Sequence, residues 1–104
     1  MNGVESKIPQ VGQIVKVLRG RDPGEYAVVI GLVDHRFVWL ADGDHRKFDQ
    51  PKKKNLNHLQ LQEMISSEVA SSIRETGRVT NGKLRFAIAK FVERMQDEAQ
   101  EKGE

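Results

Sequence analysis

The sequence predicts a mainly β protein with C-terminal helices: one small five-stranded antiparallel barrel, closed or nearly closed, followed by two helices. Residues 14–61 contain five short runs rich in strand-forming residues, separated by turn signals. From residue 61 the apolar residues recur every four positions, which is typical of a helix. The length of 104 residues suits one small domain with an appendage.

The expected strands follow one another at short intervals. In order, they are residues 14–18, 26–33, 36–41, 46–49 and 58–61. Gly20 and Gly24 bound the first connecting loop, and Asp42-Gly43-Asp44 is a turn signal after the third strand. Pro51 and the three lysines after it fit a loop or a sheet edge. Such closely spaced strands favour a small barrel, whose closure or helical cover protects its edges.

Two amphipathic helices are expected in the second half. The first has an apolar face and ends at Gly77; its residues are Leu61, Met64, Ile65, Val69 and Ile73. The second begins after an N-cap signal at Val79-Thr80-Asn81. Its apolar stripe contains Leu84, Ile88, Phe91, Val92, Met95 and Ala99. We therefore divide the chain into a barrel domain, 8–62, and a helical extension, 63–104.

The composition argues against several classes of protein. The sequence contains no cysteines. Its apolar runs are far shorter than the about 20 residues needed to span a membrane. Its start lacks the features of a leader peptide. The segment GRDPGEY lacks the Gly-Lys-Ser/Thr ending of a phosphate-binding loop. The histidines are too widely spaced for a tight ligand pair. We expect a cytoplasmic protein that is not an enzyme and has no metal, cofactor, small-molecule substrate or membrane partner.

The basic residues are concentrated in the first part of the chain. The net charge is +2 overall, with ten Lys/Arg against seven Asp/Glu in residues 1–60 and seven against eight in residues 61–104. The loop containing Arg19 and Arg21 is restrained by Pro23 and two glycines, which favours phosphate contact because its guanidinium groups lose little freedom on binding. The run Lys52–Lys54 is either a phosphate contact or a solvated loop.

These observations give a set of candidate phosphate contacts. The first-rank residues are Arg19, Arg21, Arg46, Lys47, Lys52, Lys53 and Lys54, and the second-rank residues are Lys16 and Arg36. Phe37 and Trp39 alternate with Val38 on the third strand. We expect both aromatic residues in the core, with a stacking platform for a base as the alternative.

The segment GQIVKVLRGRDPGEYAVVIGLV, residues 12–33, resembles the KOW motif of ribosomal and transcription-elongation proteins. The matching residues are Gly12, Val15, Val17, Gly20, Asp22, Gly24 and Val29. Residues 39–43, 51–54 and 58–61 extend the resemblance to the fourteenth eukaryotic/archaeal-type large-subunit ribosomal proteins, and it is strongest to their short bacterial relatives. Ala27 replaces a glycine of many KOW motifs, a departure shared by that group.

The resemblance, over about residues 8–62, implies an SH3-like barrel that binds structured RNA, usually ribosomal RNA. It implies that the loop from Arg19 to Glu25 contacts RNA backbone. The function expected is therefore a ribosome-associated RNA-binding protein. The alternative is a protein-interaction module of the transcription or translation machinery, acting through the barrel and the C-terminal helices, which either pack on the barrel, self-associate or bind a partner helix.

Overall fold

The computed structural model describes residues 8–102. Residues 1–7, which belong to the segment examined for a leader peptide, lie outside this range. Residues 103 and 104, the end of the expected helical extension, also lie outside it.

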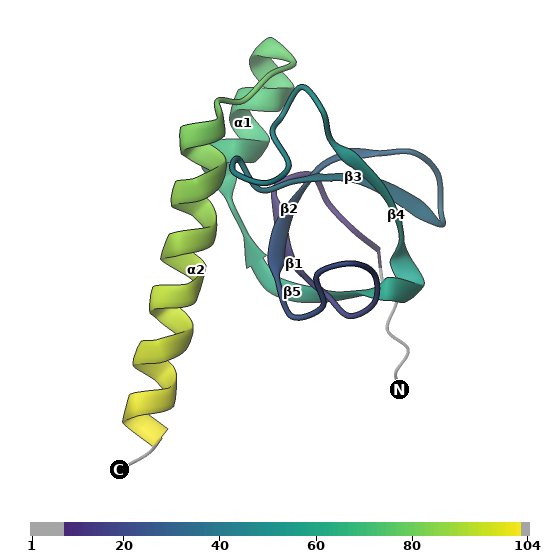
Figure 1. Cartoon of the computed structure of the whole chain (residues 1–104). Coiled ribbons are helices and arrows are strands. Elements are labelled where there is room, and N and C mark those ends of the chain that lie inside the picture. The colour runs from purple at the N-terminus through teal and green to yellow at the C-terminus, as the bar shows by residue number, and fades with distance from the viewer. Residues whose placement is uncertain (1–7, 103–104) are drawn as a thin grey trace.

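Within residues 8–102, five antiparallel strands form one sheet, and two helices follow it (Figure 1). The strands are β1 (Gln13–Val17), β2 (Tyr26–Leu32), β3 (Phe37–Ala41), β4 (Lys52–Asn55) and β5 (Leu59–Ile65). Their order across the sheet is β4-β3-β2-β1-β5. The expectation of a small five-stranded fold with two C-terminal helices is therefore confirmed, and the strand order is compatible with an SH3-like fold.

The sheet curls toward a barrel, but its hydrogen-bond ladder does not close. A 3₁₀ turn, η1 (Leu56–His58), connects the edge strands β4 and β5. The Leu18 N–H donates to the His58 carbonyl oxygen at 2.8 Å, and the Leu56 N–H donates to the Arg36 carbonyl oxygen at 2.8 Å. The turn is thus bonded both to the end of β1 and to the β2–β3 turn, which holds the two edges near each other.

The fourth strand lies later in the chain than the sequence predicts. Residues 46–49, the expected strand, belong to the β3–β4 loop, and Lys52–Asn55 form the edge strand β4 instead. The Asp42 carboxylate accepts the N–H groups of Asp44 and Arg46, each at 2.8 Å, and this turn keeps residue 46 out of the sheet. The three lysines after Pro51 were compatible with a loop or with a sheet edge, and they form a sheet edge.

The first helix also begins later than predicted. The strand β5 continues to Ile65 across the expected domain boundary, and helix α1 (Ser67–Thr76) starts where the Ser66 hydroxyl accepts the Val69 N–H at 3.1 Å. Leu61 and Ile65, assigned to the helix, pair with β1. A spacing of four residues places side chains on one face of a strand as well as of a helix, so the periodicity was ambiguous there.

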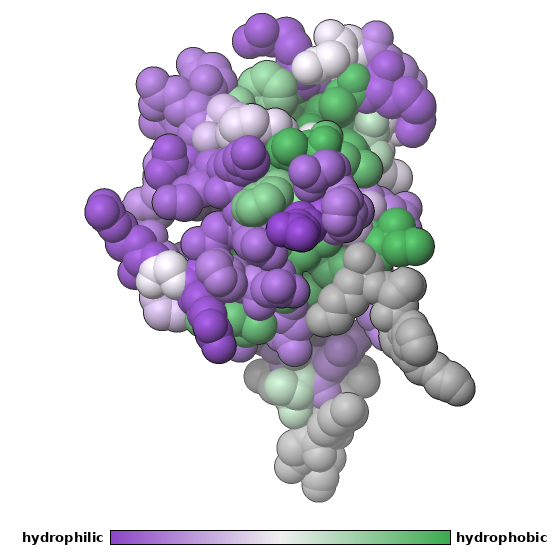
Figure 2. Space-filling model, turned by 90° about the vertical axis from the view of Figure 1, so that its right-hand side faces the viewer, coloured by the Kyte–Doolittle hydropathy of each residue, from purple (hydrophilic) through white to green (hydrophobic). Residues whose placement is uncertain are grey.

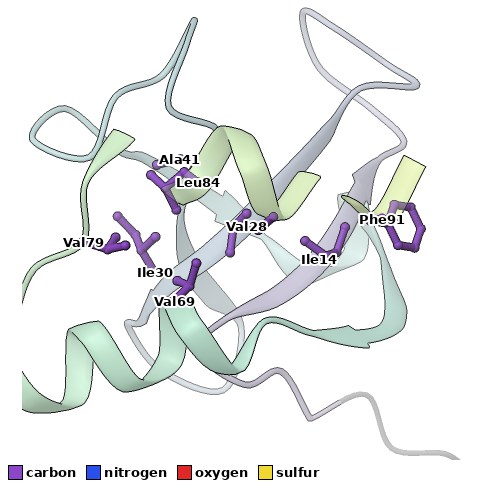
Figure 3. Close-up of a cluster of buried hydrophobic side chains, with 9 residues drawn as sticks. Ile14, Val28, Ile30, Ala41, Val69, Val79, Leu84 and Phe91 are labelled. Atoms are coloured by element: carbon purple, nitrogen blue, oxygen red, sulfur yellow. The ribbon is translucent and has the colours of Figure 1, made fainter. Parts of the chain in front are cut away.

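Two hydrophobic clusters lie on opposite faces of the sheet. The inner cluster consists of Val15, Ala27, Val29, Val38, Leu40 and Leu59. On the outer face, four sheet residues pack against both helices: Ile14, Val28, Ile30 and Ala41 (Figure 3). The burial of this outer face against helices explains why the strands contain apolar residues at consecutive positions rather than a strict alternation.

Helix α2 (Asn81–Lys102) packs on the sheet mainly with its first half. It follows Gly77, which ends α1 with a φ of 77°, and Thr80, whose hydroxyl accepts the Lys83 N–H at 3.2 Å, as the sequence predicts. Leu84, Ala87 and Phe91 are buried, and Ile88 and Val92 are half-buried. Residues 93–99 are all exposed, so the expected stripe leaves the core before Met95 and Ala99. In Figure 1 the helix continues past the sheet.

The expected core positions of Phe37 and Trp39 are wrong. Val38 is fully buried in the inner cluster, whereas Trp39 is 38% exposed and Phe37 is half-buried. Their alternation with Val38 directs both rings to the outer face. There the helix-covered cluster includes Ala41 but neither aromatic residue. Their exposure therefore follows from the limited area that the helices cover.

Replacing Gly43 by alanine should destabilise the fold by at least about 2 kcal/mol, because strain and a clash add together. Gly43 has a φ of 81°, and a Cβ there would overlap the Asn81 carbonyl oxygen and approach Arg85 Cγ at 3.1 Å. Gly24→Ala is the control, since Gly24 has a φ of 92° but no atom within 4 Å of an added Cβ. Urea unfolding should show a larger loss for Gly43→Ala; equal losses would contradict the close packing.

Candidate nucleic-acid interface

Four of the basic residues predicted to contact phosphate line one groove of about 490 Å³. Arg21 comes from the β1–β2 loop, Arg46 from the β3–β4 loop, and Lys52 and Lys54 from strand β4. We call this site the basic groove. It brings together three segments that are separated in the sequence, which the fold achieves by placing both loops at the same end of the curled sheet.

The alternation of β4 decides which lysines reach the groove. Lys52 pairs with Leu40 and Lys54 with Val38, two residues of the inner cluster, so these lysines share the inner face. Lys53 pairs with Trp39 and points to the outer face. The ammonium group of Lys54 lies so close to Gly20 that a Cβ on Gly20 would overlap it. Lys54 therefore spans from the edge strand to the β1–β2 loop.

The β1–β2 loop has the restrained backbone that its sequence predicts. Gly20 and Gly24 have φ values of 124° and 92°. The Gly24 N–H donates to the Val17 carbonyl oxygen at 2.7 Å, and the Val17 N–H donates to the Glu25 carbonyl oxygen at 2.8 Å. Arg19 and Arg21 are exposed on this loop, but only Arg21 lines the groove.

Helix α2 holds the β3–β4 loop in place through two side chains whose contacts with this loop the sequence does not predict. The Asn81 side-chain oxygen accepts the Phe48 N–H at 2.8 Å. The Arg85 guanidinium donates to the Gly43 carbonyl oxygen at 2.7 Å. These contacts lie on both sides of Arg46 in the loop. No local pattern connects positions more than 30 apart, so only the fold could identify Asn81 and Arg85 as positioning residues.

Among the described side chains, no carboxylate lies at ion-pair distance from the cations of the groove. Within residues 8–99, the ion pair found is between His45 and Asp44, at 3.8 Å, and no lysine or arginine takes part in one. Asp22, Glu25 and Asp42 also line the groove, but the Asp42 carboxylate already accepts two backbone N–H groups. The four basic side chains thus outnumber the three carboxylates of the lining, and none of the four is held in an ion pair within the described residues.

The remaining candidate residues lie outside the groove lining. Lys47 is exposed in the β3–β4 loop, and Lys16 is half-buried in β1. Lys53 places its ammonium nitrogen 5.0 Å from the centre of the Phe37 ring. Arg36 lies in the β2–β3 turn, where its N–H donates to the Asp34 carboxylate at 2.8 Å. This hydrogen bond, with one from the Phe37 N–H, lowers the pKa of Asp34.

The described residues offer little for other kinds of site. Across residues 8–102, the structure has no cluster of three or more histidine and acidic side chains arranged for a metal ion. In the same range, neither helix combines the length and apolar character needed to cross a bilayer. The three histidines lie in turns or in η1.

No protein-family model matches the chain. A curated protein of Bacillus subtilis (strain 168), described as "Putative ribosome-binding protein YbzG", is 46% identical over 71 residues. The match covers 96% of that protein and 68% of this chain. The chain belongs to the YbzG family. The family relationship therefore extends over nearly the whole of the relative, and about a third of this chain lies outside the match.

Arg85→Ala should loosen the β3–β4 loop without unfolding the protein. Loss of the hydrogen bond leaves the carbonyl of the buried Gly43 without this partner. The free energy of unfolding should therefore fall by about 1–2 kcal/mol. Hydrogen exchange of the amides in residues 43–48 should accelerate. Gln96→Ala, in the exposed half of α2, is the control and should leave this exchange unchanged. Unaltered exchange in Arg85→Ala would show that the helix does not hold the loop.

Proposed function

We propose that this chain is a non-enzymatic RNA-binding protein that associates with the ribosome, and hence works in the cytoplasm, by docking the basic groove on structured RNA. The observation that supports this proposal most directly is the convergence of four basic residues in one groove, without ion-pair partners among residues 8–99: Arg21, Arg46, Lys52 and Lys54. The description of the YbzG relative as ribosome-binding supports the same partner.

The groove suits phosphate oxygens better than a small-molecule substrate. Its cations come from a restrained loop, a loop held by α2 and an edge strand, so little side-chain and backbone freedom is lost when they meet a fixed array of charges. Guanidinium groups bind phosphate in a bidentate manner, whereas ammonium groups act as point charges. A groove of this kind recognises the shape and charge of an RNA backbone, and it does not read the base sequence.

Neighbouring basic residues extend the proposed contact. Arg19 lies on the same loop as Arg21, and Lys47 follows Arg46, so both would meet RNA bound to the groove. Four phosphate contacts would weaken binding roughly a hundredfold between 50 and 200 mM salt, and additional contacts would steepen this dependence. We also propose that the barrel is a KOW domain, related to the fourteenth eukaryotic/archaeal-type large-subunit ribosomal proteins.

The double variant Lys52→Glu/Lys54→Glu should reduce ribosome binding at least tenfold, because each reversal replaces attraction to phosphate by repulsion. The control is Lys90→Glu/Arg94→Glu, which changes the net charge equally on the exposed surface of α2. Co-sedimentation with ribosomes at 50 and 200 mM salt measures both, and circular dichroism verifies folding.

Three results would contradict the proposal. An equal loss in both variants would mean that net charge alone controls binding. Co-sedimentation that resists nuclease treatment of the ribosomes, or that follows RNA polymerase instead, would favour the protein-interaction module.

A further inference from the structure

We propose that Trp39, with Phe37 and Lys53, forms a stacking site for an unpaired base of RNA on the face of β4 opposite the basic groove. This inference rests on the proposed RNA-binding function and adds a second contact that recognises bases. We call these three residues the aromatic site.

The aromatic site is the part of the outer sheet face that the helices leave uncovered. Along β3, Ala41 is fully buried beneath the helices, whereas Trp39, two residues earlier on the same face, is 38% exposed. Val33, whose N–H donates to the Phe37 carbonyl oxygen at 3.0 Å, is also exposed. Figure 2 looks onto the side of the molecule where β4 lies, and it shows hydrophobic residues gathered among hydrophilic ones.

The indole of Trp39 lies against the strand beside it. Gly31 of β2 pairs with Trp39, next to an irregularity in the β2–β3 register. A Cβ added to Gly31 would lie 3.3 Å from Trp39 Cδ1 and 3.7 Å from Trp39 Cβ. The absence of a side chain at Gly31 therefore lets Trp39 lie close to the β2 backbone. An aromatic ring held in this way binds a flat partner with little loss of conformational freedom.

The charges around the aromatic site favour a nucleotide over an apolar peptide. Lys53 pairs directly with Trp39 and lies over the Phe37 ring, and Arg36 precedes Phe37 in the chain. Asp34, the acidic residue of the β2–β3 turn, has its carboxylate engaged by the N–H groups of Arg36 and Phe37. A base could stack on the aromatic surface while the adjacent cations contact its phosphates, the combination used by single-strand-binding surfaces.

The position of β4 connects the two sites. Among the strands of the described range, it is an edge strand that pairs with β3 alone. Lys52 and Lys54 face the groove, and Lys53 between them faces the aromatic site. Consecutive residues of β4 thus face the two sites. An RNA strand that leaves the groove and passes over this edge would meet the aromatic site directly on the other face.

Trp39 is the sole tryptophan of the chain, so its fluorescence reports on this site directly. The probes are an octamer of adenylate and an abasic octamer with the same number of phosphates. We expect the adenylate octamer to quench the emission and bind about tenfold more tightly than the abasic one. Equal affinity and equal quenching by the two probes would overturn the proposal.

Variants separate this inference from the function of the groove. Trp39→Leu should lose the tenfold preference for adenylate, measured with a fluorescent label on the octamers, whereas Trp39→Phe should retain part of it. The groove variant Lys52→Glu/Lys54→Glu should bind both octamers more weakly yet retain the preference. If that variant binds ribosomes normally while adenylate still quenches Trp39, the groove proposal fails and the stacking site stands. If Trp39→Leu abolishes ribosome binding but no octamer quenches, the surface binds protein and the stacking proposal fails.

Discussion

The hydrogen bond from the Arg85 guanidinium to the Gly43 carbonyl oxygen joins the helical and β parts of this protein at the point where its candidate site is built. The packing of Leu84 and Phe91 against the sheet brings Arg85 to that carbonyl, and Asn81 secures the loop at Phe48. The loop between them contains Arg46 and leads into the lysines of β4. The geometry of the basic groove thus depends on a hydrophobic contact made on the other face of the sheet.

Strand β4 has two different surfaces because its side chains alternate. Lys52 and Lys54 face inward, where their aliphatic stems lie near the inner core, and Lys53 faces outward beside Trp39. A run of three identical residues is therefore divided between the two proposed sites, which differ in chemistry. The curl of the sheet and the missing ladder between β4 and β5 leave both surfaces of this strand accessible to one ligand.

Local signals in the sequence predict the elements better than they predict their contacts. The glycines at 20, 24 and 77 have the positive φ values that their turns require, because that conformation is a property of the residue itself. The stretch 61–65 was misassigned because a spacing of four fits both a strand and a helix. The sequence places Trp39 in the core wrongly, because hydrophobicity does not reveal where the cover of α2 ends. Asn81 and Arg85 were missed because their partners are distant in the sequence.

The lysines of the open edge also have a consequence for the behaviour of the protein at high concentration. An edge strand offers unpaired backbone N–H and C=O groups, and a second copy of the chain could add its own strand there. Three consecutive ammonium groups repel an identical edge and make that addition costly. The same residues that we assign to RNA therefore protect an incompletely closed sheet from aggregation, so replacing them with apolar residues would cost solubility as well as binding.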